Sequence, residues 1–176
     1  KRQVKEGDAM KGAYLGPRFT DDSLRGFLED RGISYKYLNN NELTRTVARH
    51  IKDGKVVGWF QGRMEFGPRA LGSRSIIADP SKNTMQKTLN LKVKYRESFR
   101  PFAPSVLRED LAEWFNLNED SPYMLLVSNI AESKKIKMTE EQKNLFGIDK
   151  LNIKRSQIPA VTHVDYSARI QTVHEK

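Results

Sequence analysis

The chain has 176 residues, of which 38% are hydrophobic, and it has no apolar run long enough to span a bilayer. Its 31 Lys and Arg outnumber its 22 Asp and Glu, which gives a formal net charge of +9. It contains no cysteine, which excludes a disulfide scaffold, thiol catalysis and a cysteine-based zinc site, so we expect a soluble, cytoplasmic protein without membrane contact.

The first part of the chain alternates between helical and extended patterns. A helix is expected over residues 20–32, because capping oxygens stand at its start and a glycine at its end. The alternation in ISYKYL predicts a strand over 33–38. A second helix is expected over 41–53, and VVGWF predicts a buried strand over 56–60.

The same alternation continues to the end of the chain. Strands are expected at 75–80 and 103–107, with helices after each, and residues 159–173 predict one or two further strands. This order favours one α/β domain over residues 1–176, with ligand groups on loops and strand ends. The polar stretch 128–157 is interpreted as an insertion or a mobile loop.

Two segments combine cations with glycine, proline and aromatic residues: GWFQGRMEFGPRALGSRS at 58–75 and KVKYRESFRPFAPS at 92–105. Residues 63–108 hold ten basic and three acidic side chains, a net charge of +7, so most of the charge of the chain is local. Glycine permits close backbone approach and proline fixes the chain, so these cations are typical of a rigid anion site.

The arginines and one lysine are the candidate phosphate ligands. Arg69, Arg100 and Arg169 offer planar forks for bidentate contacts, and Lys94 offers a compact charge, although composition alone does not separate it from its basic neighbours Lys92 and Arg96. The alternative for each arginine is a solvated or paired surface role. Lower-ranked candidates are Arg63, Arg74, Arg96, Ser105 and His163.

Other site patterns are excluded or left open. Gly62 and Gly67 have the spacing of a P-loop, but Pro68 and Arg69 stand where that loop needs lysine and a hydroxyl. The histidines lack metal-ligand spacing, so no metal site is predicted. His163 precedes an aspartate by two residues, which suits a base, a phosphate contact or a purely structural role.

The segments GWFQGRMEFGPRALGSRSIIADP, LNLKVKYRESFRPFAPSVL and THVDYSARIQTV together resemble the C-terminal domain of O-carbamoyltransferases of the nodulation and antibiotic-biosynthesis type. The resemblance implies a YrdC-like α/β domain, a twisted mixed sheet flanked by helices. It also implies binding of ATP, with Mg²⁺, and of carbamoyl phosphate, and formation of a carbamoyl-adenylate with release of phosphate and pyrophosphate.

The resemblance assigns roles and a partner. Arg69, Lys94, Arg100 and Arg169 correspond to the family's carbamoyl phosphate and nucleotide phosphate ligands, with Lys94 and Arg100 as the catalytic pair. In the family, a sugar-kinase-like, metal-binding N-terminal domain of the same polypeptide transfers the carbamoyl group to a hydroxyl of a small-molecule acceptor. We therefore expect this chain to be a truncated domain of a longer protein.

Two other functions fit the same residues. A net charge of +7 with interleaved aromatic side chains also suits an RNA-binding module, whose affinity would fall steeply with salt. A noncatalytic domain that senses carbamoyl phosphate would bind the ligand without forming an adenylate. Charge and spacing alone do not decide among the three.

Overall fold

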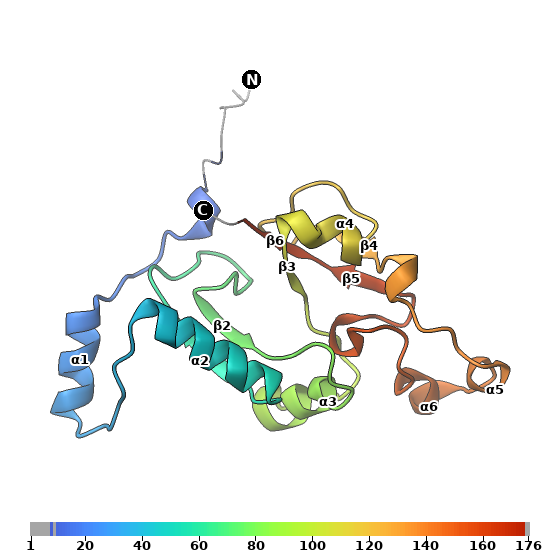
Figure 1. Ribbon diagram of the computed structural model, residues 1–176, viewed down its shortest axis with the longest axis horizontal. Helices are drawn as coiled ribbons and strands as arrows, with labels where there is room; N and C mark the ends of the chain where they lie inside the picture. Colours follow the sequence, from blue (N-terminus) through green and yellow to red (C-terminus); the bar gives the residue numbers. More distant parts are fainter. Residues whose placement is uncertain (1–7, 9, 175–176) are drawn as a thin grey trace. The chain divides into compact units, whose positions relative to one another are not determined.

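The computed structural model describes residues 8 and 10–174, and the chain divides into two compact units, Lys1–Ile77 and Ala78–Lys176, called unit 1 and unit 2 below. The ribbon of Figure 1 is coloured along the chain, so unit 1 runs from blue to green and unit 2 from green to red. Among the described residues, no helix combines the length and the apolar character that crossing a membrane would require.

Unit 1 contains two helices followed by a hairpin. Its elements are η1 (Lys11–Ala13), α1 (Asp21–Asp30), α2 (Asn40–Lys52), β1 (Val57–Phe60) and β2 (Arg74–Ile77). α1 begins after Thr20, whose side chain accepts the N–H of Ser23, and α2 begins with a capping box between Asn39 and Glu42. The two predicted helices and the strand at β1 are confirmed, with ends that differ by one or two residues.

The strand predicted over residues 33–38 is wrong. This segment links α1 to α2 and pairs with no strand of the described chain. Its alternate side chains Ile33, Tyr35 and Tyr37 are 46%, 44% and 69% exposed, so the face that the pattern marks as buried lies at the surface. Alternation of apolar and polar residues predicts a strand only where a neighbouring strand can pair with the segment and a core can bury its apolar face.

β1 and β2 pair in an antiparallel register from Val57↔Ile77 to Phe60↔Arg74. Their connection, residues 61–73, contains most of the first glycine and arginine segment. The segment is therefore the loop of a hairpin, and its two ends are fixed by the ladder.

Unit 2 is built from short helices around two strand pairs. Its elements are α3 (Met85–Leu89), η2 (Asn90–Lys94), β3 (Ser105–Leu107), η3 (Arg108–Asp110), α4 (Leu111–Trp114), β4 (Val127–Asn129), η4 (Glu132–Lys134), α5 (Glu140–Lys143), α6 (Gly147–Leu151), η5 (Pro159–Val161), β5 (Ser167–Arg169) and β6 (Gln171–Val173). β4 pairs antiparallel with β5, and β3 pairs parallel with β6. Helices and strands of both orientations confirm the α/β class.

Ile170 lies at the centre of unit 2. It is fully buried and separates β5 from β6, so the chain changes its pairing partner at this residue. The core around it contains Leu111, Phe115, Ile130, Ile158, Val161 and Ala168. Each fully buried large apolar side chain contributes about 1.5–3 kcal/mol, which makes this cluster the main stabilising feature of unit 2.

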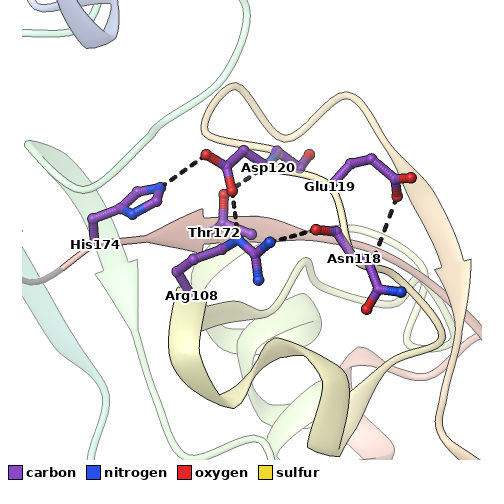
Figure 2. Close-up of polar contacts among 7 residues, drawn as sticks. Arg108, Asn118, Glu119, Asp120, Thr172 and His174 are labelled. Atoms are coloured by element: carbon purple, nitrogen blue, oxygen red, sulfur yellow. Dashed lines mark hydrogen bonds and ion pairs between the residues drawn. The ribbon is translucent and has the colours of Figure 1, made fainter.

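The loop that follows α4 is bound to β6 through side chains. Ser121 is buried and donates its hydroxyl to the Ile170 carbonyl at 2.8 Å, while its N–H donates to the Thr172 hydroxyl at 2.8 Å. Figure 2 shows Asp120 between Arg108 and His174, with the His174 Nε2 atom 3.3 Å from Asp120 Oδ2. These contacts hold the end of β6 against residues 118–121.

The stretch 128–157 begins and ends in the folded part of unit 2. Ile130 and Ser156 are fully buried, and Lys135 and Ser156 form an antiparallel bridge. The Ile136 N–H donates to the Arg155 carbonyl at 2.7 Å, and the Gln157 N–H to the Lys134 carbonyl at 2.9 Å. The polar residues between, including α5 and α6, extend from the core of unit 2 and return to it where Lys135 pairs with Ser156, a point called the neck below.

Candidate functional site

In unit 1 the loop between β1 and β2 is organised around the carboxylate of Glu65. The side chain is 6% exposed, and its Oε1 atom accepts the backbone N–H groups of Leu71 at 2.8 Å, Ser73 at 2.6 Å and Arg74 at 3.2 Å. Burial raises the pKa of Glu65, but the N–H donors outweigh burial and hold the pKa below its ordinary value. The segment thus contains an anion site, but a side chain of the protein occupies it.

The outer side of this loop is fixed by arginine. Arg74 donates to the carbonyls of Gln61 at 2.7 Å, Ser73 at 2.9 Å and Gly62 at 3.1 Å, and its guanidinium stacks 3.5 Å from the centre of the Phe60 ring. Arg63 donates to the Gly16 carbonyl at 3.0 Å. These contacts use both arginines to hold the loop, which is a structural role.

Arg69 differs from these two arginines. Its side chain is half-buried, and its Nε atom is buried without a hydrogen-bond partner among the described residues. A buried donor left unpaired costs about 1–3 kcal/mol, so this group is prepared for an acceptor from outside the described chain. The loop therefore presents one cation whose hydrogen bonding is incomplete.

In unit 2 the second basic segment follows a change in helix type. α3 continues into η2, a π-helix that ends at Lys94, and Tyr95 then takes the left-handed conformation at φ 49°. Asn90 is fully buried, and its amide donates to the carbonyls of Ser98 at 3.1 Å and Arg100 at 2.8 Å. Its oxygen accepts Nε of Arg96 at 2.6 Å, so one amide holds the whole loop 95–100.

The basic side chains of this loop have unequal partners. Arg96 bonds Asn90 and stacks 4.9 Å from the Phe102 ring centre, and Arg100 forms an ion pair with Glu97 at 2.9 Å. Lys94 is exposed and makes neither a hydrogen bond nor an ion pair within the described chain. Of the two predicted catalytic residues, Lys94 is unpaired and Arg100 is paired.

Unit 2 also contains a cavity of about 280 Å³ where the second and third sequence segments meet. Its walls are Pro101, Phe102, Ala103, Val127, Val161, His163, Ser167, Ala168 and Arg169. Arg169 and His163 are the sequence-predicted residues in this lining, and the Gln171 N–H donates to the Pro104 carbonyl at 2.9 Å, which joins the two segments. An apolar pocket with one arginine and one histidine can hold a small ligand that carries a phosphate.

His163 belongs to a turn rather than to a strand. The Tyr166 N–H donates to the His163 carbonyl at 3.0 Å, and Nδ1 of His163 lies 3.1 Å from Oδ1 of Asp165. The same carboxylate oxygen accepts the Ser167 hydroxyl at 2.6 Å and the Ser167 N–H at 3.0 Å. These Ser167 donors, and then His163, lower the pKa of Asp165 to about 2.

Ser105 is placed by the parallel ladder. It lies opposite Gln171, and its hydroxyl donates to Oε1 of Gln171 at 3.0 Å. Gln171 is 6% exposed, so this contact fixes the end of β3 against β6. The contacts of Ser105 therefore give it a structural role in the pairing of β3 with β6.

The predicted ligands therefore fall in both units. Arg69 lies in unit 1, whereas Lys94, Arg100 and Arg169 lie in unit 2. The sequence analysis singled out neither Asn90, which arranges the second segment, nor Glu65, which binds backbone N–H groups. Within the described residues, no group of three or more His, Asp or Glu side chains could hold a metal ion.

Comparisons with known proteins identify relatives of the whole chain. The family model described as "Carbamoyltransferase C-terminus" matches residues 48–176. An uncharacterized protein of Synechocystis is 58% identical over 98% of this chain and 28% of its own length. The nodulation protein NolNO of Sinorhizobium fredii is 46% identical over 94% of this chain and 22% of its own length.

A relative with a named activity is the 3'-hydroxymethylcephem-O-carbamoyltransferase of Amycolatopsis lactamdurans, which is 38% identical over 78% of this chain and 21% of its own length. The chain thus spans between a fifth and a third of the length of these relatives. The family match covers well over half of the chain and includes all three sequence segments. The chain belongs to the carbamoyltransferase C-terminus family.

Proposed function

We propose that the chain is the domain of an O-carbamoyltransferase that binds ATP and carbamoyl phosphate and forms a carbamoyl-adenylate. The observation that carries the proposal is the cavity of unit 2, where the Pro101–Ala103 wall meets Arg169 and His163. Family membership and the named activity of a relative support the same class of reaction.

Four cations are the proposed phosphate ligands. Arg169 lines the cavity, and Lys94, the last residue of η2, is followed by the loop 95–100, which carries Arg100 and leads directly into the Pro101–Ala103 wall. Arg69 supports the proposal because its buried Nε has no acceptor among the described residues. Fixed cations of this kind stabilise charge on two polyanions that must approach each other.

Mg²⁺ is proposed to arrive with ATP. The described residues include no carboxylate and histidine group suited to a resident metal, so the nucleotide phosphates would supply most of the metal's oxygen ligands. The ion would neutralise phosphate charge. The protein residues would orient the phosphates and exclude water, with the ring of Phe102 available as an apolar wall.

The acceptor is proposed to be a hydroxyl group of a small molecule, carbamoylated by an N-terminal, sugar-kinase-like and metal-binding domain of the same polypeptide. The greater length of the relatives supports this division of labour. A cytoplasmic location stays a prediction.

Calorimetric titration of the chain with Mg·ATP, with and without carbamoyl phosphate, tests the proposal. We expect micromolar binding that weakens at least about tenfold in Lys94→Ala and Arg169→Ala, because each removes a charge-assisted contact of about 1.5–3 kcal/mol. Lys154→Ala is the matched control, since this lysine of unit 2 is exposed. A folded chain that binds neither ligand would contradict the proposal.

Exchange of labelled pyrophosphate into ATP then tests the chemistry. Exchange that depends on carbamoyl phosphate indicates adenylate formation, whereas binding without exchange identifies a sensor of carbamoyl phosphate. The RNA-binding alternative is favoured by the +7 charge of residues 63–108. It predicts binding to single-stranded RNA that falls steeply between 50 and 200 mM salt, on the order of 10³-fold, and tolerates any single Arg→Ala change.

A further inference from the structure

The loop between β1 and β2 is held from within by a single carboxylate. Three contacts, from the N–H groups of Leu71, Ser73 and Arg74, converge on the Oε1 atom of Glu65 over distances of 2.6–3.2 Å, while the N–H of Gly72 between them donates to the Ser75 hydroxyl. Successive backbone N–H groups that point at one oxygen form a nest, an arrangement that favours an anion. Gly72 lies inside the nest at φ 113°, a conformation that glycine adopts readily.

The backbone on either side of Glu65 is anchored as well. The N–H of Phe66 donates to the Ala13 carbonyl at 2.7 Å, and the N–H groups of Gly16 and Met64 bond across the same pair of segments at 2.9 and 3.0 Å. A Cβ atom at Gly16 would lie 2.8 Å from the Met64 carbonyl oxygen, so this approach requires glycine. Residues 13–17 therefore fix the backbone on which Glu65 stands.

The tip of the loop lies between these two fixed parts. Gly67, Pro68 and Arg69 follow Glu65 after Phe66, and Leu71 begins the nest. The Tyr14 hydroxyl donates to the Leu71 carbonyl at 3.1 Å, which clamps the same end of the tip. The backbone of Arg69 is thus held at both ends of the loop tip, while its buried Nε–H group has no acceptor among the described residues.

We propose that Glu65 is a positioning residue that holds the loop tip so that the Arg69 guanidinium is presented to the anionic ligand. Glu65 touches no ligand in this role. Its carboxylate occupies the nest in place of an external anion. It thereby links the backbone that is fixed by residues 13–17 to the far end of the tip that carries Arg69. The assignment of the ligand as a phosphate rests on the proposed function, but the positioning itself does not.

Hydrogen exchange on the full chain tests the positioning without nucleotide. We expect the amides of Leu71, Ser73 and Arg74 to exchange at least about tenfold faster in Glu65→Ala, and the Arg69 Nε–H signal in the NMR spectrum to move and broaden. Glu65→Gln keeps an acceptor oxygen and should restore part of the protection. Glu42→Ala is the control, because it removes a helix cap elsewhere in unit 1.

A double-mutant cycle then connects the loop to the ligand. Arg69→Ala and Glu65→Ala should each weaken Mg·ATP binding about tenfold, and the double variant should be no weaker than either, because both remove the same contact. Additive losses, or unchanged Arg69 and amide signals in Glu65→Ala, would overturn the inference. Absence of nucleotide binding by the wild-type chain would instead count against the proposed function alone. If Glu65→Ala does not fold, Glu65→Gln decides the exchange measurement.

Discussion

Asn90 offers a sharp test of how the second basic segment is held. Its side chain is fully buried and makes three hydrogen bonds, to Nε of Arg96 and to the carbonyls of Ser98 and Arg100. Asn90→Ala removes all three contacts without adding bulk. The two carbonyls and the guanidinium would then need new partners.

The expected loss of stability follows from the partners. Two neutral hydrogen bonds contribute about 1 kcal/mol each, and a bond to the charged Arg96 about 1.5–3 kcal/mol, which gives a loss of about 4 kcal/mol for the side chain. A change of 1 kcal/mol shifts the melting temperature of a chain of this size by about 2–4 °C. We therefore expect the melting transition of the chain to fall by about 8–16 °C.

Differential scanning calorimetry measures this shift directly. Asn152→Ala is the matched control, because this asparagine of unit 2 is exposed and should leave the transition within about 2 °C. Asn90→Asp retains the acceptor for Arg96 but places a buried carboxylate oxygen against the two carbonyl oxygens, so its transition should fall at least as far as that of Asn90→Ala. A shift below about 2 °C in Asn90→Ala would refute the reasoning that this amide holds the loop.

Three further outcomes are expected. The carboxylate of Asp165 has a pKa of about 2 against an ordinary 3.8, so it stabilises the fold at higher pH and loses this contribution as the pH falls through 2. Because the side chain is 66% exposed, Asp165→Asn should lower the free energy of unfolding in urea by less than about 1 kcal/mol at pH 6 and by nothing near pH 1.5. An equal loss at both pH values would contradict this expectation. Ile170→Ala should lower the free energy of unfolding by about 2–5 kcal/mol, because the side chain is fully buried. Leu125→Ala, at a 63% exposed site, should lower it by less than about 0.5 kcal/mol. Equal losses for the two variants in chemical denaturation would exclude the assignment of Ile170 to the core. Lys94→Ala should change the melting temperature by less than about 2 °C, since Lys94 is exposed and unpaired, and a larger fall would mean that its loss of binding reports unfolding.

The helices were predictable because their signals are local. Caps at Thr20 and Asn39 stand beside the residues whose N–H groups they accept, so a short stretch of sequence contains both partners. The parallel pairing of Ser105 with Gln171 joins residues far apart in the chain, and no local pattern indicates it. The alternation of residues 33–38 was misleading for the same reason, because a strand depends on a distant partner.

The loop of the first basic segment was predictable as a closely held turn, but its internal contacts were not. Glycine, proline and arginine marked the loop of residues 61–73, and the structure places it in a hairpin as a closely held turn. The residue that holds it, Glu65, binds backbone N–H groups, and every residue type offers such donors, so the sequence contains no sign of the pairing. The structural role of Arg74, a candidate ligand in the sequence, was hidden in the same way, because its acceptors are backbone carbonyls.

The neck at Lys135 and Ser156 has a consequence for engineering. Because both ends of the excursion are joined there by backbone hydrogen bonds, a change in its length stays local and leaves the register of β4 and β5 intact. Doubling a flexible loop costs only about 0.6 kcal/mol of closure entropy. A fluorescent reporter or an affinity label inserted between α5 and α6 should therefore leave the pairing of β4 with β5 undisturbed.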